Sequence, residues 1–472
     1  MERSNVIPFI SAGLLSPKKR DHPLARRQLY LNYGALSLAT MLELDGRNTL
    51  LIHGDHETPE VTLHRLASMG IFPTRHPVML SIPSFYALPW AQAFCRLVKA
   101  MDQEARIVVG GRWVVGPDVA WLRSKLPEAD VFVPGLGEPV IESLLTDSPD
   151  LRRLAAPTPA FTLNHLRVVD QLRFQPSIEA SRGCGMGCKF CEERDIPLEK
   201  LREPEEIARS IALVQDQYSG SEIHPYMQAS MFVPNPRWSA RLAAAVQELN
   251  LDVKWRTESR VDALLPEAIP HLASAGLKIL DLGLETASPT QILAMKKANN
   301  PERYLTKASA LLQACRDAGV LAKVNVLLYA GETRKTLAET TQWLDSHASC
   351  IAGVSVGPVV AYGPPATANI LLDEWSLVGA RPVDAASAGE TGITRMHLSK
   401  DFDADQAELA SLKVSRRFMS MDAYFTLKSF SYYPRDYDRA DFDRDVTASA
   451  SGRLPFELVP SPVRASPSMS GS

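Results

Sequence analysis

Short apolar runs alternate with longer segments of helical spacing over the first third of the chain. Continuous apolar runs between helices are typical of parallel strands that are buried on both faces. Strands are predicted at 49–53, 78–82, 107–109 and 131–133. Helices are predicted at 30–44, 61–69, 91–101, 118–126 and 140–145. The pattern predicts a doubly wound, Rossmann-like α/β domain over residues 1–150, in which residues 1–25 are a loose lead-in and ligands bind at the carboxyl ends of the strands.

A second alternating series follows residues 151–176, which contain several prolines and are predicted to be a linker. Strands are predicted at 177–181, 224–228, 251–255, 278–284, 320–328 and 353–360. Helices are predicted between them, at 203–217, 238–249, 266–275, 302–318 and 334–346. Six strand–helix repeats predict a partial (β/α)6 TIM-type barrel over residues 177–365, with its chemistry at the carboxyl ends of the strands.

The alternation weakens after Pro365. Residues 366–440 are predicted to form a C-terminal region on the substrate side, with one helical segment at 401–433. Residues 441–472 are rich in Ser, Pro and Arg, a composition that predicts a disordered tail.

Charge and hydropathy exclude several classes of protein. The chain has 51 basic and 54 acidic residues, so no broad electrostatic attraction to nucleic acid or to an anionic membrane is expected. No apolar run approaches the ~18–20 residues that a membrane helix requires. The first residues do not show the pattern of a secretory signal peptide. We therefore expect a cytoplasmic protein.

Three of the six cysteines lie within eight residues, in the sequence Ser-Arg-Gly-Cys-Gly-Met-Gly-Cys-Lys-Phe-Cys that ends at position 191. Cys184, Cys188 and Cys191 have the spacing C-x3-C-x2-C directly after the first predicted barrel strand. Thiolates suit zinc or iron–sulfur clusters, but a structural zinc site needs four protein ligands and no histidine lies between 166 and 223. Three thiolates on a cluster of four irons leave one iron open. The other cysteines, Cys95, Cys315 and Cys350, lie singly, and Cys315 and Cys350 are expected to be small buried side chains.

This loop resembles that of the radical S-adenosylmethionine (SAM) superfamily, because Phe190 precedes the third cysteine and a βα barrel follows. The resemblance implies a [4Fe–4S] cluster whose open iron binds the amino and carboxylate groups of SAM. It also implies an electron donor such as flavodoxin or ferredoxin, and cleavage of a carbon–sulfur bond to make a radical. The alternative from the residues alone is a set of three core or zinc-binding cysteines.

Two further segments resemble a branch of that superfamily that includes cobalamin-linked and methylthio-transferring members. They are Glu258-Ser259-Arg260 after the third predicted strand and Leu282-Gly283-Leu284-Glu285-Thr286 at the end of the fourth. The resemblance implies that Phe190, Glu258, Arg260 and Glu285 bind the cofactor. The chain departs from the branch after the second strand, where it has Gln228-Ala229-Ser230-Met231-Phe232 in place of acidic residues.

Each of these residues also has a purely structural alternative. Glu258 and Arg260 would otherwise form a surface ion pair. Glu285 would otherwise be a partner of a helix N-cap. The sequence Gly331-Glu332-Thr333, which resembles a turn of the same branch, would otherwise begin a helix with Thr333 as its cap.

Residues 33–142 resemble the cobalamin-binding domain that precedes the barrel in many radical SAM enzymes. The matching strand-end residues are Gly110, Gly111, Gly135, Gly137 and Glu138, which are expected to form one mouth facing the barrel and to bind the cofactor. The family's lower-ligand pattern, D-x-H-x-x-G, is absent from His53-Gly54-Asp55-His56-Glu57, so neither histidine is expected to ligate cobalt. The alternatives are a domain that has kept the fold without the cofactor and, for the histidines, an exposed loop cluster.

The resulting hypothesis is a radical SAM enzyme that transfers a SAM-derived carbon group, methyl through cobalamin, to a small molecule in secondary metabolism. A cobalamin-free enzyme that transfers another SAM fragment, such as 3-amino-3-carboxypropyl, or rearranges its substrate is the main alternative. RNA modification is a further alternative that the balanced charge disfavours. A non-enzymatic zinc- or cluster-bearing binding protein is the last. The sequence identifies neither the substrate nor the catalytic residues.

Overall fold

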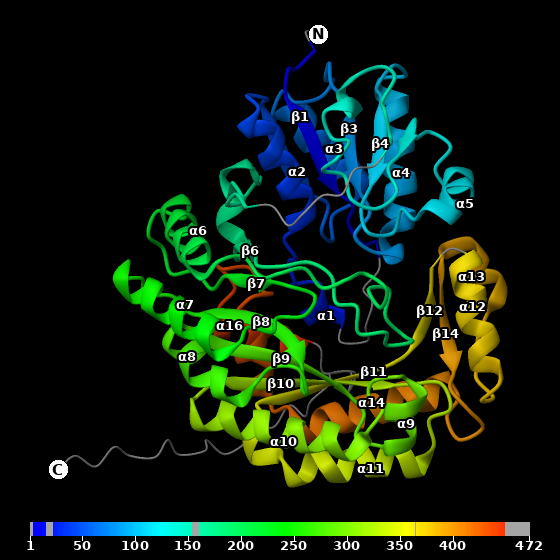
Figure 1. Cartoon of the computed structure of the whole chain (residues 1–472). Helices are drawn as coiled ribbons and strands as arrows, with labels where there is room; N and C mark the ends of the chain where they lie inside the picture. The colour runs from blue at the N-terminus through cyan, green and yellow to red at the C-terminus, as the bar shows by residue number, and fades with distance from the viewer. Residues whose placement is uncertain (1–2, 16–21, 153–159, 364, 449–472) are drawn as a thin grey trace.

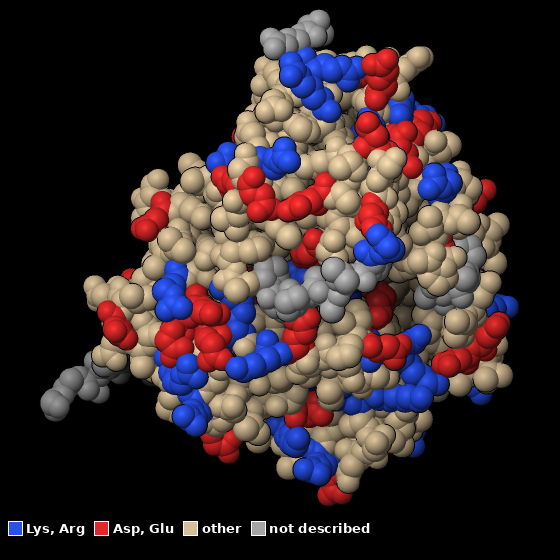
Figure 2. All heavy atoms as spheres, turned by 45° about the horizontal axis from the view of Figure 1, so that its top comes forward, with Lys and Arg blue, Asp and Glu red and all other residues tan. Residues whose placement is uncertain are grey.

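The computed structural model describes residues 3–15, 22–152, 160–363 and 365–448. It contains two α/β units, the N-terminal one above the second in the view of Figure 1, and a C-terminal region that packs on the second unit. No helix in the described ranges is both long and apolar enough to cross a membrane. Basic and acidic side chains are interspersed over the face shown in Figure 2, as the balanced composition predicts.

The N-terminal unit is a five-stranded parallel sheet in the order β2-β1-β3-β4-β5. Its strands are β1 (Ile7–Ser11), β2 (Thr49–His53), β3 (Val78–Ser81), β4 (Ile107–Gly110) and β5 (Val131–Phe132). The expectation that residues 1–25 are a loose lead-in is wrong, because β1 pairs with both β2 and β3 and all of its residues are buried. Pro8 within this short run disguised the strand, since proline is rare in central strands.

Helices cover both faces of this sheet, and a separate apolar core lies on each face. The helices are α2 (Tyr33–Leu44), α3 (Pro59–Ser68), α4 (Leu88–Met101) and α5 (Val119–Lys125). The helix predicted at 140–145 is reduced to a short 3-10 turn, Ser143–Leu145. The predicted linker is not loose, because its described part, 160–176, contributes Leu163, Val168 and Phe174 to one of the two cores.

The second unit is a six-stranded parallel sheet in the order β11-β10-β9-β8-β7-β6, which is the predicted partial barrel. Its strands are β6 (Ser177–Glu179), β7 (Tyr226–Gln228), β8 (Trp255–Arg260), β9 (Leu277–Glu285), β10 (Leu321–Leu328) and β11 (Gly353–Pro358). Its helices are α6 (Pro204–Gln217), α7 (Pro236–Glu248), α8 (Ile269–Ser274), α9 (Pro289–Ala294), α10 (Pro301–Asp317) and α11 (Arg334–Ser346).

The third barrel strand was predicted too early, at 251–255. It runs over Trp255–Arg260, so Glu258 and Arg260 lie within the strand rather than after it. Charged residues occupy alternate positions of β8, and this pattern does not resemble the apolar runs of the other strands.

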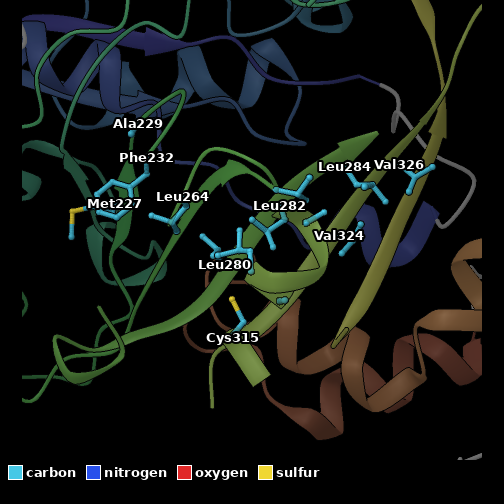
Figure 3. Close-up of a cluster of buried hydrophobic side chains, with 14 of the residues drawn as sticks. Met227, Ala229, Phe232, Leu264, Leu280, Leu282, Leu284, Cys315, Val324 and Val326 are labelled. Atoms are coloured by element: carbon cyan, nitrogen blue, oxygen red, sulfur yellow. The ribbon is translucent and has the colours of Figure 1, made fainter. Parts of the chain in front are cut away.

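The two faces of the barrel strands differ in chemistry. Leu280, Leu282 and Leu284 of β9 and Val324 and Val326 of β10 belong to one buried apolar cluster, which also contains Cys315 of α10 (Figure 3). Side chains at the intervening positions face the lumen, because successive residues of a strand point to opposite faces.

The C-terminal region is more ordered than predicted. It contains a three-stranded antiparallel sheet in the order β12-β14-β13. Its elements are β12 (Val360–Tyr362), α12 (Pro365–Ser376), β13 (Arg381–Pro382), α13 (Ala385–Thr391), β14 (Ile393–His397), α14 (Ala404–Phe418), α15 (Met421–Ser429) and α16 (Arg439–Ala448). The single helix predicted at 401–433 is two helices, because Met419 is extended and Ser420 caps α15.

The tail predicted to be disordered from 441 begins inside α16, and its remainder, 449–472, lies outside the described residues. An apolar cluster links α15 and α16 with α1 (His22–Ala25) and with Ile279 of β9. The C-terminal helices therefore close the end of the barrel at which its strands begin.

Candidate active site

Cys184, Cys188 and Cys191 lie in the loop that follows β6, at the carboxyl end of the barrel strands. Gly183, Gly185 and Gly187 all have φ near +70°, a conformation that other residues rarely adopt. A Cβ on Gly183 would collide with the carbonyl oxygen of Pro197. The glycines therefore let this loop fold tightly on itself, and the three thiols belong to one short segment.

The donor set fits a cluster. In the described residues, no group of three or more His, Cys, Asp and Glu side chains converges on a single metal ion. An iron–sulfur cluster does not require such convergence, because each thiolate binds a different iron. Burial raises the pKa of Cys184 and raises the pKa of Cys191 to about 11, so the free thiols are protonated at neutral pH. A bound metal would supply the charge that favours the thiolates.

Two neighbouring segments support the cysteine loop. Met231, after β7, lies with its sulfur 4.0 Å from Cys184 Sγ. The amide of Lys189 donates to the carbonyl of Met295. Segment 228–232, which lacks the acidic residues of the related branch, thus contacts the cysteine loop through the thioether of Met231.

Arg260 ends β8 directly beside the cysteine loop. Its Nη1 donates to Cys188 Sγ at 3.3 Å, and its guanidinium also pairs with Asp262 and donates to the carbonyl of Lys297. The alternative of a surface ion pair with Glu258 is wrong, because Arg260 is buried and pairs with Asp262. Arg260 therefore holds the Cys188 thiol, a proposed cluster ligand, in place.

Glu285 ends β9 on the lumen side, with φ at +60°. Its Oε1 lies 3.2 Å from Lys297 Nζ, which in turn lies 5.6 Å from the centre of the Phe190 ring. The carbonyl of Phe190 accepts a hydrogen bond from the Tyr362 hydroxyl at 2.9 Å. The structure thus brings three predicted residues, Phe190, Arg260 and Glu285, together around the cysteine loop.

Glu258 lies on the same face of β8 as Arg260 but two residues earlier. Its side chain is exposed, although its strand neighbours are buried. Burial within the lumen, together with the charges of Asp281 and Glu193, raises the pKa of Glu258 to about 7. Solvent therefore reaches a carboxyl group that is surrounded by protein.

The strand ends of the N-terminal unit face the cysteine loop. Arg112, which follows Gly110 and Gly111, pairs with Glu192 at 2.9 Å and with Glu193 at 3.1 Å, directly after Cys191. Glu138, in the predicted turn of Gly135 and Gly137, pairs with Arg182 at 2.7 Å. The prediction that this mouth faces the barrel is therefore confirmed by contacts.

His53, at the end of β2, is not arranged as a ligand. His53 is buried rather than part of an exposed cluster, and its Nε2 accepts a hydrogen bond from the amide of Asn32 at 3.0 Å. Burial lowers the pKa of His53 to about 3, so the ring is neutral. Its role is to fix the loop before α2, where Asn32 also donates to Ser11 and Ser81.

The structure also tests the expectations for Thr333 and for the single cysteines. Thr333 caps α11 through a reciprocal pair with Thr336, which confirms the helix-start alternative. Cys315 is buried as predicted, whereas Cys350 is only partly buried. Cys95, for which no prediction was made, is also buried.

Sequence reasoning missed Lys297, Arg112 and Tyr362, which contact the cysteine loop or its neighbours from distant parts of the chain. Arg112 was adjacent to a predicted glycine pair, so its position did carry a signal. Lys297 and Tyr362 lie outside any pattern that was recognised.

Comparisons with known proteins agree with this geometry. Residues 178–344 match the model of the Radical SAM superfamily. No curated protein matches the chain.

Solved structures share the fold at low sequence identity. A structure titled cobalamin-dependent S-adenosylmethionine radical enzyme OxsB, with aqua-cobalamin and S-adenosylmethionine bound, has a TM-score of 0.58 at 13% identity and covers 94% of this chain and 66% of that one. With aqua-cobalamin alone, OxsB gives a TM-score of 0.56 at 14% identity, over 72% of this chain and 52% of that one. The radical S-adenosylmethionine methyltransferase TsrM from Kitasatospora setae has a TM-score of 0.50 at 17% identity, over 75% and 73%.

The chain therefore spans between half and two thirds of the OxsB structures that it matches. The family model covers the strands and loops that carry the three cysteines, Arg260 and Glu285. Residues 178–344 therefore form a domain of the Radical SAM superfamily, and the chain as a whole shares the fold of the OxsB and TsrM structures.

Proposed function

We propose that this enzyme transfers a methyl group from SAM, by way of cobalamin, to a small molecule. The observation that carries the proposal is the pairing of Arg112 with Glu192 and Glu193. This contact holds the strand ends of the N-terminal domain against the loop of the cluster ligands, so a cofactor at those strand ends would adjoin the cluster.

The residues fit each cofactor to a different degree. Cys184, Cys188 and Cys191 would hold a [4Fe–4S] cluster, and Arg260 would donate a hydrogen bond to one of its thiolates. Phe190, Glu285 and Lys297 surround the position beside it and are the proposed contacts for SAM. The cluster would supply the electron that cleaves SAM.

Cobalamin fits only without a histidine ligand, because His53 Nε2 already accepts a hydrogen bond. A Cβ built on Gly110 would meet nothing within 4 Å, so this strand end is open to a ligand. Gly110, Gly111, Gly135, Gly137 and Glu138 are the proposed cobalamin contacts. OxsB is a cobalamin-dependent S-adenosylmethionine radical enzyme and TsrM is a radical S-adenosylmethionine methyltransferase, and the fold that they share with this chain supports the same assignment here.

The test combines metal content with SAM turnover. Full-length protein is produced with added hydroxocobalamin and reconstituted anaerobically with iron and sulfide. We expect about four irons and one cobalt per chain, with cobalt binding unchanged in His56→Ala. Replacing all three cysteines by Ala should abolish iron binding and SAM cleavage.

Two outcomes contradict the proposal at different levels. Stoichiometric zinc without iron uptake would contradict the cluster assignment. Protein that binds no cobalamin yet cleaves SAM would contradict methyl transfer through cobalamin and support the cobalamin-free alternative, in which another SAM fragment is transferred or the substrate is rearranged.

A further inference from the structure

The lumen of the barrel is polar and accessible where a packed barrel would be apolar. In closed TIM barrels, bulky branched side chains fill the interior in layers. Here five of the strands, β7 to β11, each have at least one lumen-facing residue that reaches solvent while its neighbours in the strand are buried. These accessible lumen-facing positions are Tyr226, Gln228, Glu258, Gly283, Asn325 and Ser355.

A buried ion network forms the floor of this lumen. Asp281 of β9 pairs with Arg256 of β8 at 2.5 Å and with Lys323 of β10 at 2.8 Å. Burial alone would raise the pKa of Asp281, but these two cations hold it well below its usual range. Arg256 also donates to the carbonyl of Leu427 and lies 4.4 Å from the centre of the Tyr432 ring. The charged groups of the floor therefore have their ion-pair partners within the floor itself.

Glu258 differs from the other lumen carboxylates because it lacks an ion pair among the described residues. Asp281 has two cations and Glu285 has Lys297. Within the described residues, the side chain of Glu258 accepts a hydrogen bond from the Tyr226 hydroxyl alone, at 3.4 Å. Lys323 and Arg112 influence Glu258 only at longer range, against the opposing influence of Asp281 and Glu193. When the Glu258 carboxyl group is ionised, no Lys or Arg of the described residues forms an ion pair with it.

The depth of Glu258 separates it from the cluster. Arg260 contacts Cys188 at the top of β8, and Arg256 belongs to the floor. Glu258 lies between them on the same face, about 6.6 Å below Arg260 at the usual rise of a strand. A group bound to Glu258 would therefore belong to a molecule that extends down into the lumen.

We infer that Glu258 binds a cationic nitrogen of the substrate, an amine or a guanidinium group, within the barrel lumen. The Tyr226 hydroxyl and the amides of Gln228 and Asn325 face the same space and can bind neighbouring polar groups. The inference rests on the proposed function, because it takes the lumen below the cysteine loop as the substrate site. It moves Glu258 from the cofactor contacts, where resemblance placed it, to the substrate contacts.

The experiment uses full-length, cluster-reconstituted protein and three matched probes: butylammonium, butanol and butyrate. Saturation-transfer NMR measures binding of each probe to the wild-type chain and to Glu258→Gln, which keeps the size of the side chain. Losing a hydrogen bond to a charged group should weaken butylammonium roughly tenfold or more. Butanol and butyrate should bind weakly and equally to both proteins.

Three controls distinguish the possible causes. Glu302→Gln, at the exposed start of α10, should leave butylammonium binding unchanged. Glu258→Asp, which keeps the charge on a shorter side chain, should fall between wild type and Glu258→Gln. The affinity for SAM should be the same in wild type and Glu258→Gln, and thermal unfolding should confirm that both are folded.

The inference is overturned if butylammonium binds equally to wild type and Glu258→Gln, or fails to bind the wild type. It is also overturned if Glu258→Gln weakens SAM and not butylammonium, because Glu258 would then be a cofactor contact. Failure of the proposed function has a different signature, namely loss of cobalamin binding with the preference for butylammonium retained.

Discussion

Single residues at the mouth of the barrel divide into those that shape the cysteine loop and those that face a ligand. Arg260 is held by three groups, Cys188, Asp262 and the carbonyl of Lys297. Glu285, by contrast, has one cationic partner and lies at the lumen edge of β9. Arg260 is therefore expected to affect cluster and SAM together, whereas Glu285 can be tested for SAM alone.

Replacing Glu285 with Gln should weaken SAM binding and leave the iron content unchanged. Loss of one charged hydrogen bond costs about 1.5–3 kcal/mol, which corresponds to roughly tenfold or more in affinity. Equilibrium dialysis with the reconstituted variant measures the affinity for SAM. Glu302→Gln is the matched control, and an unchanged affinity in Glu285→Gln would remove Glu285 from the SAM contacts.

Two glycines of the cysteine loop allow steric contact to be separated from backbone strain. Gly183 and Gly187 have nearly the same φ, +72° and +71°, but only Gly183 faces an atom that a Cβ would strike. Gly187→Ala should cost about 1–2 kcal/mol of backbone strain. Gly183→Ala should cost more and reduce iron uptake, since Pro197 would have to move. Iron content and unfolding midpoints of both variants check this, and equal effects would contradict it.

The carboxyl group of Glu332 should make stability depend on pH. Burial raises its pKa to about 7 from an ordinary value of 4.5. Between these values the unfolded chain releases a proton that the folded chain keeps, so this group lowers stability as pH rises. Glu332→Gln removes the effect, and its advantage in urea midpoint over wild type should be larger at pH 8 than at pH 5. The same difference at both pH values would contradict the assignment.

At the scale of elements, sequence patterns predicted the strands whose environment is uniform. Apolar runs located β2, β3, β4 and β10 closely, because both faces of these strands or their outer faces are buried. The pattern misplaced β8, because Arg256, Glu258 and Arg260 face the polar lumen. A strand that lines a ligand site is thus the strand that an apolar pattern detects least well.

In the candidate site, residues that are close together in the sequence were predicted, whereas residues that come from distant parts of the sequence were not. The three cysteines and Phe190 are close in sequence, so their spacing was sufficient. Lys297 and Tyr362 reach the same loop from other elements, and Asp281 and Lys323 form an ion pair across two strands. Such pairs depend on strand register, which composition and periodicity do not determine.

Arg112 should couple the two α/β units through the segment after the third cysteine. Its guanidinium is half exposed and contacts two carboxylates, so its loss should cost about 1 kcal/mol at most. Arg112→Ala should increase amide hydrogen exchange in residues 110–116 and 182–200, and leave iron content unchanged. Arg316→Ala, an exposed arginine on α10 that pairs with Asp317, is the control. Unchanged exchange in both segments would contradict a coupling role.

At the scale of the whole molecule, the boundary between the two units is the feature most altered by the structure. Residues 151–176 were predicted to be a linker after a domain of residues 1–150. The described part of this segment, 160–176, instead packs on the N-terminal sheet, where the amide of Val169 donates to the carbonyl of Leu51 and Phe174 lies against His53. His165 of the same segment binds Gln217 of α6. The segment is therefore a shared structural element.

This packing predicts that a fragment of residues 1–176 is more stable than a fragment of residues 1–150. The longer fragment buries Leu163, Val168 and Phe174 in the core between the sheet and α2. Each buried apolar side chain contributes about 1.5–3 kcal/mol, so the difference should amount to several kcal/mol. Urea unfolding of both fragments measures it, and Phe174→Ala in the longer fragment should remove part of the gain. Leu172→Ala, an exposed leucine in the same segment, should not. Equal midpoints for the two fragments would restore a boundary at 150 and show that residues 160–176 are held in place by the barrel alone.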